Sequence, residues 1–311
     1  MSGPLLAISR TEINQITILE LGEMEREFTT IRVKGKQPFG LAFDKMGRSL
    51  YAACWTSARI AALNLLSCKE EKSLSVARLP AWATPRPGTS EIWISNEGAG
   101  VVTILDTHTW SVSCEIATGG GPSDIAFTNR GHYAWVTNEK DENISLIDAD
   151  RRCKVQDIRV GKVPQGIAVA QDESQLLVAN FGSNSISVVD TATKKELARV
   201  AVDLGPVDVV TLGHENLERA WVTCFREGVV SVVDVKRREE TQRIATGGKP
   251  QGLETHPNGQ YVYVAIRDIN EIVVLSTVAP SNILRRIKMP GGPARMAVAS
   301  ECDAHRNIPF R

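Results

Sequence analysis

Residues 164–205 read PQGIAVAQDESQLLVANFGSNSISVVDTATKKELARVAVDLG, and this stretch decides the fold. It holds four short runs rich in apolar and β-branched residues, IAVA, QLLVAN, SISVVD and ELARVAV, separated by polar or glycine-containing turns. Runs of this kind between turn residues predict four consecutive antiparallel strands, here named A, B, C and D. Residues 122–148 and 250–276 follow the same plan.

A proline that precedes strand A recurs along the whole chain, at Pro38, Pro80, Pro122, Pro164, Pro206, Pro250 and Pro293. The successive intervals are 42, 42, 42, 42, 44 and 43 residues. So regular a period predicts a repeat architecture, and it explains how 311 residues can form one domain where length alone would favour two. Because a small four-stranded sheet can bury its faces only against its neighbours, we predict an all-β β-propeller.

The ends of the chain complete the repeat count. Residues 293–299 form a strand A with nothing after it, whereas residues 5–35 supply strands B, C and D with no strand A before them. Joining them predicts a seven-bladed ring, closed by the C-terminal strand in the N-terminal blade, that leaves no open edge. We expect one domain over residues 1–300 and a polar tail over 301–311. The expected blades are 5–36 plus 292–300, 37–79, 80–120, 121–162, 163–205, 206–248 and 249–291.

The segment VANFGSNSISVVDTATKKEL (residues 178–197) and the recurring G-x-P-x-G/D turn resemble the YVTN family of WD-like β-propeller repeats over nearly the whole chain. The streptogramin lyases and the bacterial propeller lactonases are more distantly similar. The resemblance implies the propeller fold. It implies no single activity, because the family includes surface proteins, binding modules and enzymes.

Composition narrows the classes of partner. The 36 basic and 36 acidic residues balance, which disfavours binding to nucleic acid or to an acidic membrane. The N-terminus MSGPLLAISR has no basic region before an apolar stretch, and no segment is long and apolar enough to span a bilayer. We therefore expect a cytoplasmic protein, and a monomer because a closed ring needs no partner. The six cysteines form no C-x-x-C pair, so we expect reduced thiols and no zinc site.

Strand order predicts which loops can form a binding site. The B-to-C and D-to-A loops emerge on one face, where propellers usually bind ligands around the central channel. The histidines lie in A-to-B segments, a C-to-D turn or the tail, which disfavours the lyase mechanism based on histidine and magnesium. One large residue per B strand is expected to pack between blades: Leu6, Tyr51, Trp93, Trp135, Leu177, Trp221 and Tyr263.

Two rings of residues depart from the repeat on that face. The second residues after the repeat prolines are Gly40, Trp82, Asp124, Gly166, Asp208, Gly252 and Arg295. The strand B ends contribute Arg10, Trp55, Glu97, Glu139, Phe181, Phe225 and Arg267. Because the first and last blades are neighbours in the closed ring, Arg10, Arg267 and Arg295 form one arc. The acids Glu97, Glu139 and Asp124 of blades 3 and 4 form a second arc, and the aromatic residues lie between the two arcs. A mouth of this kind suits a small organic ligand with an anionic group.

Two readings stay open. In the first, Arg10, Arg267 and Arg295 hold the anion, and the side chains Trp55, Trp82, Phe181, Asp208 and Phe225 line the site. Glu97, Glu139 or Asp124 then exchanges a proton in a lyase, hydrolase or isomerase, or the acids hold a divalent metal such as magnesium. No other cofactor is evident. In the second, the rings serve only for recognition of a metabolite or a protein partner. Cys54 and Cys224 replace a repeated asparagine and are expected to be buried thiols rather than nucleophiles.

Overall fold

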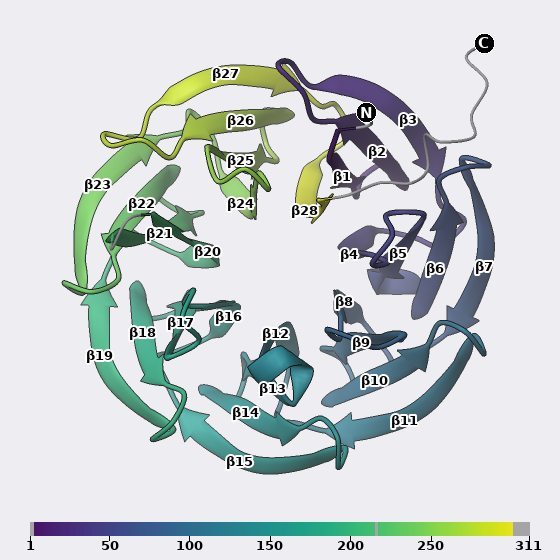
Figure 1. Cartoon of the computed structure of the whole chain (residues 1–311), viewed down its shortest axis with the longest axis horizontal. Helices are drawn as coiled ribbons and strands as arrows, with labels where there is room; N and C mark the ends of the chain where they lie inside the picture. Colours follow the sequence, from purple (N-terminus) through teal and green to yellow (C-terminus); the bar gives the residue numbers. More distant parts are fainter. Residues whose placement is uncertain (1–2, 215–216, 301–311) are drawn as a thin grey trace.

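A computed structural model describes residues 3–214 and 217–300, and within them the chain forms seven four-stranded antiparallel sheets. Figure 1 shows the sheets arranged as blades around a common centre, with strand A of each blade innermost and strand D outermost. The predicted all-β, seven-bladed propeller is therefore confirmed. The expected tail at residues 301–311 lies outside the described residues.

The first four blades occupy the N-terminal half of the chain and the closing strand. Blade 1 consists of β28 (Pro293–Ala299), β1 (Leu5–Arg10), β2 (Gln15–Glu20) and β3 (Arg26–Arg32). Blade 2 consists of β4 (Pro38–Phe43), β5 (Ser49–Cys54), β6 (Arg59–Asn64) and β7 (Lys69–Ser75). Blade 3 consists of β8 (Pro80–Pro85), β9 (Glu91–Asn96), β10 (Val101–Asp106) and β11 (Ser111–Ala117). Blade 4 consists of β12 (Pro122–Thr128), β13 (Tyr133–Asn138), β14 (Asn143–Asp148) and β15 (Cys153–Arg159).

The remaining blades follow the same order. Blade 5 consists of β16 (Pro164–Val169), β17 (Gln175–Asn180), β18 (Ser185–Asp190) and β19 (Lys195–Ala201). Blade 6 consists of β20 (Pro206–His214), β21 (Leu217–Cys224), β22 (Val229–Asp234) and β23 (Glu239–Ala245). Blade 7 consists of β24 (Pro250–Thr255), β25 (Tyr261–Ile266), β26 (Glu271–Ser276) and β27 (Ile283–Lys288). Two 3-10 turns, η1 (Trp55–Ser57) and η2 (Asn129–Gly131), lie in connecting loops. The described part of the chain has no helix with the length and apolarity that crossing a membrane requires.

The ring closes as the sequence predicts. Strand β28 pairs antiparallel with β1, from Leu5 opposite Ala299 to Arg10 opposite Pro293. The loop between β2 and β3 adds a polar contact to blade 7, because the Glu25 carboxylate accepts a hydrogen bond from Arg285 Nε (2.7 Å) and another from the Tyr263 hydroxyl (3.0 Å). Both backbone pairing and a largely buried ion pair therefore join the first and last blades.

Apolar clusters fill the spaces between blades. The large residue of each strand B contributes to them, and all seven side chains are buried, as predicted: Leu6, Tyr51, Trp93, Trp135, Leu177, Trp221 and Tyr263. Trp135, for example, packs with Leu176 and Val178 of the next blade. Burial of such side chains removes apolar surface from water, which is the main favourable contribution to folding.

Each inner strand is irregular just after its repeat proline. The pairing register between strands A and B shifts by one residue in every blade, for example between Pro122 and Ile125 in blade 4. Such β-bulges redirect side chains and are frequent beside functional sites. The second residue after the proline lies at or next to this irregularity, on the wall of the channel.

Candidate functional site

The first predicted ring forms one layer across the middle of the channel. Its members are Gly40, Trp82, Asp124, Gly166, Asp208, Gly252 and Arg295. The three glycines allow neighbouring inner strands to approach closely. A Cβ atom on Gly252 would lie 2.3 Å from the Ala294 carbonyl oxygen, and one on Gly166 would lie 2.8 Å from the Asp208 Cα. The inner strands of neighbouring blades are therefore in close contact at this level.

Replacing Gly40 with alanine is expected to destabilise the protein by about 3 kcal/mol, because overpacking against backbone cannot be relieved by a side-chain rotation. The new Cβ would lie 2.5 Å from the Ala81 oxygen and 2.6 Å from the Trp82 Cα. Gly22→Ala is the matched control, because its Cβ would meet nothing closer than 3.7 Å. Urea unfolding of the two variants checks this, and equal midpoints would show that the strands can separate at no cost.

Each aspartate of the layer connects two inner strands that share no backbone ladder. Asp124 accepts the Ile125 N–H at one oxygen (2.7 Å) and the Ile167 N–H of blade 5 at the other (3.0 Å). Asp208 likewise accepts the N–H of Val209, its neighbour in blade 6, at one oxygen and the N–H of Leu253 in blade 7 at the other, both at 2.9 Å. The carboxylates are thereby held rigidly in the channel.

A ring of hydroxyl groups supports the layer, and the sequence prediction did not include it. The backbone N–H groups of Trp82, Asp124, Asp208 and Arg295 donate to Ser95, Thr137, Thr223 and Ser9, respectively. The corresponding residues in the three glycine blades are Ala53, Ala179 and Ala265. In every blade that places a side chain in the layer, strand B therefore carries a serine or threonine hydroxyl at this position. This correlation is visible in the aligned repeats and could have been found there.

Arg295 is the central cation of the layer and is only 4% exposed. Its Nη1 donates to Asp208 Oδ2 at 2.8 Å, and its guanidinium carbon lies 4.1 Å from the ring centroid of Trp82 and 5.1 Å from that of Phe39. Its Nε is buried and has no hydrogen-bond partner among the described residues. An unpaired buried N–H is costly, so this atom is a donor without an acceptor in the protein.

The two aspartates differ in their partners. Burial raises the pKa of both carboxyl groups, but only Asp208 accepts a hydrogen bond from the guanidinium, which favours its charged form. Burial and the neighbouring Asp208 raise the pKa of Asp124 to about 8. Near neutral pH Asp124 therefore holds a proton, and the Arg295–Asp208 pair is balanced in charge.

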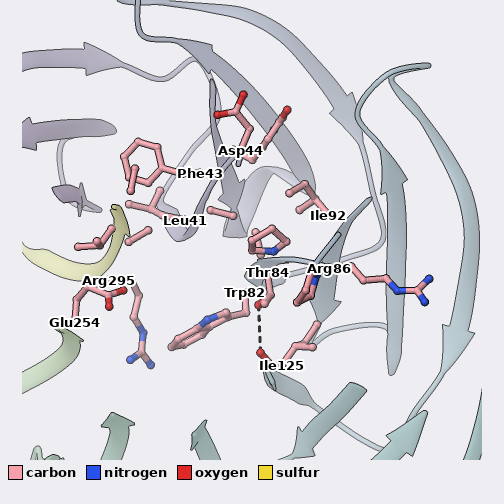
Figure 2. Close-up of a pocket in the computed structure, with 18 of the residues that line it drawn as sticks. Leu41, Phe43, Asp44, Trp82, Thr84, Arg86, Ile92, Ile125, Glu254 and Arg295 are labelled. Carbon is pink, nitrogen blue, oxygen red and sulfur yellow. Dashed lines mark hydrogen bonds between the residues drawn. The ribbon is translucent and has the colours of Figure 1, made fainter. Parts of the chain in front are cut away.

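A cavity of about 650 Å³ adjoins this layer. It continues from Trp82, Asp124, Asp208 and Arg295 along the inner strands to the A-to-B turns of blades 2 and 3, and Figure 2 shows its lining from Asp44 to Arg86. Its volume lies in the range of small-molecule sites. The cavity is not lined by any B-to-C or D-to-A loop residue, so it lies at the opposite end of the channel from the mouth that we predicted from the sequence.

Glu254 is the lining residue that the sequence prediction missed. It lies on β24 two residues after Gly252, and burial raises its pKa to about 7, with a smaller contribution from Asp208. The other blades have small or apolar residues at this position, namely Ala42, Thr84, Ala126, Ala168, Val210 and Ala297. The single acid among them was the signal that could have identified it.

The acids of the predicted mouth lie close enough to interact. Glu97 and Glu139 follow strands B of blades 3 and 4, and their backbone N–H groups donate to Leu79 and Gly121 across the D-to-A turns. Burial and the nearby Glu97 raise the pKa of Glu139 to about 7. Glu139 is therefore a further acid with a raised pKa, and neither it nor Glu97 lines the cavity.

The other predicted residues of that mouth have local partners. Arg10 Nε donates to the Pro290 carbonyl at 2.6 Å, and Arg267 faces Glu12 at 3.5 Å. Of the three arginines of the expected cationic arc, Arg295 alone lines the cavity.

The mouth aromatics are also engaged locally. Arg226 lies over the Phe181 ring at 4.3 Å, Lys249 lies over Phe225 at 5.6 Å, and Trp55 begins η1. Of the four predicted aromatics, Trp82 alone lines the cavity, together with Phe43 and Tyr51, which the prediction did not include.

The reactive residue types give no further candidate. Cys54 and Cys224 are fully buried, and burial raises the pKa of each thiol to about 12, so both are buried thiols as expected. The residues lining the cavity include no histidine: His132 pairs with Asp150, and His256 packs on Tyr261. Within residues 3–214 and 217–300, no group of three or more His, Cys, Asp or Glu side chains is arranged to hold a metal ion.

Comparisons with known proteins bear on the fold. No protein-family model matches the sequence, and no curated protein matches it. Solved structures do match. A protein from Lactobacillus plantarum has a TM-score of 0.82 at 13% identity, covering 96% of this chain and 99% of that one.

Two further similar structures carry functional descriptions. A Bacteroides fragilis protein described provisionally as a 6-phosphogluconolactonase has a TM-score of 0.80 at 16% identity, covering 96% and 98% of the two chains. Hydrazine synthase from Kuenenia stuttgartiensis has a TM-score of 0.74 at 16% identity, covering 88% and 92%. At these identities the likeness establishes architecture alone: the chain has the seven-bladed, propeller-lactonase-like fold.

Proposed function

We propose that this protein binds a small organic molecule with an anionic or strongly accepting oxygen in the channel cavity, at Arg295. The observation that carries the proposal is the buried Nε–H of Arg295, which lacks a protein partner next to a cavity of suitable size. Arg295 is positioned by Asp208 on one side and by the Trp82 ring on the other, so a ligand oxygen would meet a preorganised donor.

The charge of the layer favours this ligand near neutral pH. Asp208 is offset by the guanidinium, and Asp124 is held in its neutral form, so neither carboxyl group adds net repulsion there. Apolar side chains provide the remaining wall, including Leu41, Ile92 and Ile125, which Figure 2 shows around the cavity. An organic body bearing one anionic group suits this combination better than a bare inorganic ion does.

A thermal-shift screen tests the proposal with small carboxylates, sugar phosphates and lactones, each paired with a neutral analogue. A ligand that binds the folded state should raise the melting temperature by several degrees when its concentration far exceeds its Kd. The shift should vanish in the Arg295→Met/Asp208→Asn variant, in which both charges are removed together. Equal shifts for acids and neutral analogues, or shifts that persist in this variant, would contradict the proposal.

A lyase, hydrolase or isomerase is the second candidate. The specific observation is that Asp124 and Glu254 line the same cavity with pKa values of about 8 and about 7, which suits a general acid or base. The similar Bacteroides fragilis protein carries a lactonase description, which is why lactones belong in the panel. Mass spectrometry of each stabilising compound after incubation with the protein distinguishes binding from turnover. A binding protein returns the compound unchanged.

A further inference from the structure

The cavity contains an acid, Glu254, to which the proposed binding of an anionic group at Arg295 gives no role. Glu254 accepts a hydrogen bond from the N–H of the adjacent Thr255 at 2.8 Å, through one of its two carboxylate oxygens. It has no ion-pair partner among residues 3–214 and 217–300. A carboxylate in the wall of a partly dry cavity loses hydration, and burial accordingly raises its pKa to about 7. A cation in the cavity would relieve this cost.

Glu254 and Arg295 belong to the same part of the cavity. Their strands β24 and β28 are in backbone contact, since a Cβ atom on Gly252 would lie 3.2 Å from the Arg295 Cα. Asp208 is bonded to Arg295 and also acts electrostatically on Glu254. Figure 2 draws both Glu254 and Arg295 among the residues that line the cavity. A candidate anion receptor and a candidate cation receptor therefore line one cavity.

Resting on the proposed function, we infer that the natural ligand also carries an ammonium group, which Glu254 binds while Arg295 binds the acid. Its class is an amine-bearing acid with an apolar body, such as an α-amino acid, because such molecules combine the two charges with an apolar part. The apolar wall that includes Leu41, Ile92 and Ile125 would contact the rest of the molecule. A charge-assisted contact in a buried site contributes more than one between neutral groups.

Calorimetric titration with phenylalanine, 3-phenylpropionate and phenethylamine tests the inference. These three probes share a ring and differ only in which charges they carry. In the wild-type protein, phenylalanine should bind at least about tenfold more tightly than either analogue, the effect of one charge-assisted contact. In Glu254→Gln, which retains the acceptor for the Thr255 N–H, that preference over 3-phenylpropionate should disappear while 3-phenylpropionate binds as before. The surface variant Glu196→Gln should retain the preference.

The outcomes separate the inference from the proposal beneath it. If 3-phenylpropionate or other acids bind in an Arg295-dependent way and phenylalanine gains nothing, the ammonium inference is wrong and the anion site stands. An equal loss of both acids in Glu254→Gln also contradicts the inference, because it indicates a structural role for Glu254. If no acid binds, with or without an amine, both ideas fail.

Discussion

Replacing Arg295 with methionine is expected to lower the free energy of unfolding by about 3 to 5 kcal/mol, the usual cost of leaving one member of a buried ion pair without its partner. Asp208 is 5% exposed and would keep only its two backbone donors. In Arg295→Met/Asp208→Asn the loss of unfolding free energy should be smaller by about 2 kcal/mol or more, because the unpaired Asp208 carboxylate is then absent. Urea unfolding of both variants measures the difference.

Arg267→Ala is the matched control for this experiment. Arg267 also pairs with an acid, but its side chain is 38% exposed and that of Glu12 is 54% exposed. Pairs of this kind contribute about 1 kcal/mol or less. An Arg295→Met variant as stable as Arg267→Ala would mean that water reaches the layer, and the description of a dry, preorganised site would be wrong.

Stability is expected to fall by roughly 2 to 3 kcal/mol between pH 6 and pH 9 through Asp124 alone. Its pKa is about 8 in the folded protein against an ordinary value of 3.8, so the folded state retains a proton that the unfolded chain has released. The stabilising contribution is full below about pH 4 and is lost as the pH rises through 8. Asp124→Asn has no such proton, and its pH profile should be flatter by this amount.

The comparison with Asp124→Asn isolates one carboxyl group from the others. Glu139 and Glu254 also have pKa values raised to about 7, and they contribute a decline in the same direction in both proteins. Asparagine can accept only one of the two backbone N–H groups that Asp124 binds, so the variant should be less stable at pH 6. Parallel profiles for the two proteins would show that Asp124 is ionised throughout this range.

The repeat made the fold and the channel layer predictable. Strands and turns are encoded locally, and the proline spacing assigns each residue to a blade position, so the sequence alone places Trp82, Asp208 and Arg295 in one ring. Closure through residues 293–299 followed from counting strands. The same reasoning explains why the large residue of each strand B packs between blades, since its position in the strand determines which face it occupies.

The position of the cavity along the channel could not be predicted in this way. It depends on the sizes of the side chains along the inner strands and on which residues of the predicted mouth bind local partners. Arg10 and Arg267 find partners at Pro290 and Glu12, which no spacing in the sequence specifies. Glu254 was missed for a different reason. The predicted ring contained only the second residue after each repeat proline, whereas Glu254 is the fourth residue after Pro250. Side chains two positions apart on a strand lie on the same face, so this position could have been included.

The central claim is that the ligand binds at Arg295 in the cavity rather than at the loop mouth predicted from the sequence. Calorimetric titration of the best acid from the thermal-shift panel into the wild-type protein, Arg267→Ala and Arg295→Met/Asp208→Asn tests this most directly. We predict that Arg267→Ala binds as tightly as the wild-type protein and that the double variant, confirmed to be folded, does not bind detectably. Loss of binding in Arg267→Ala with retention in the double variant would place the site at the other end of the channel and contradict the claim.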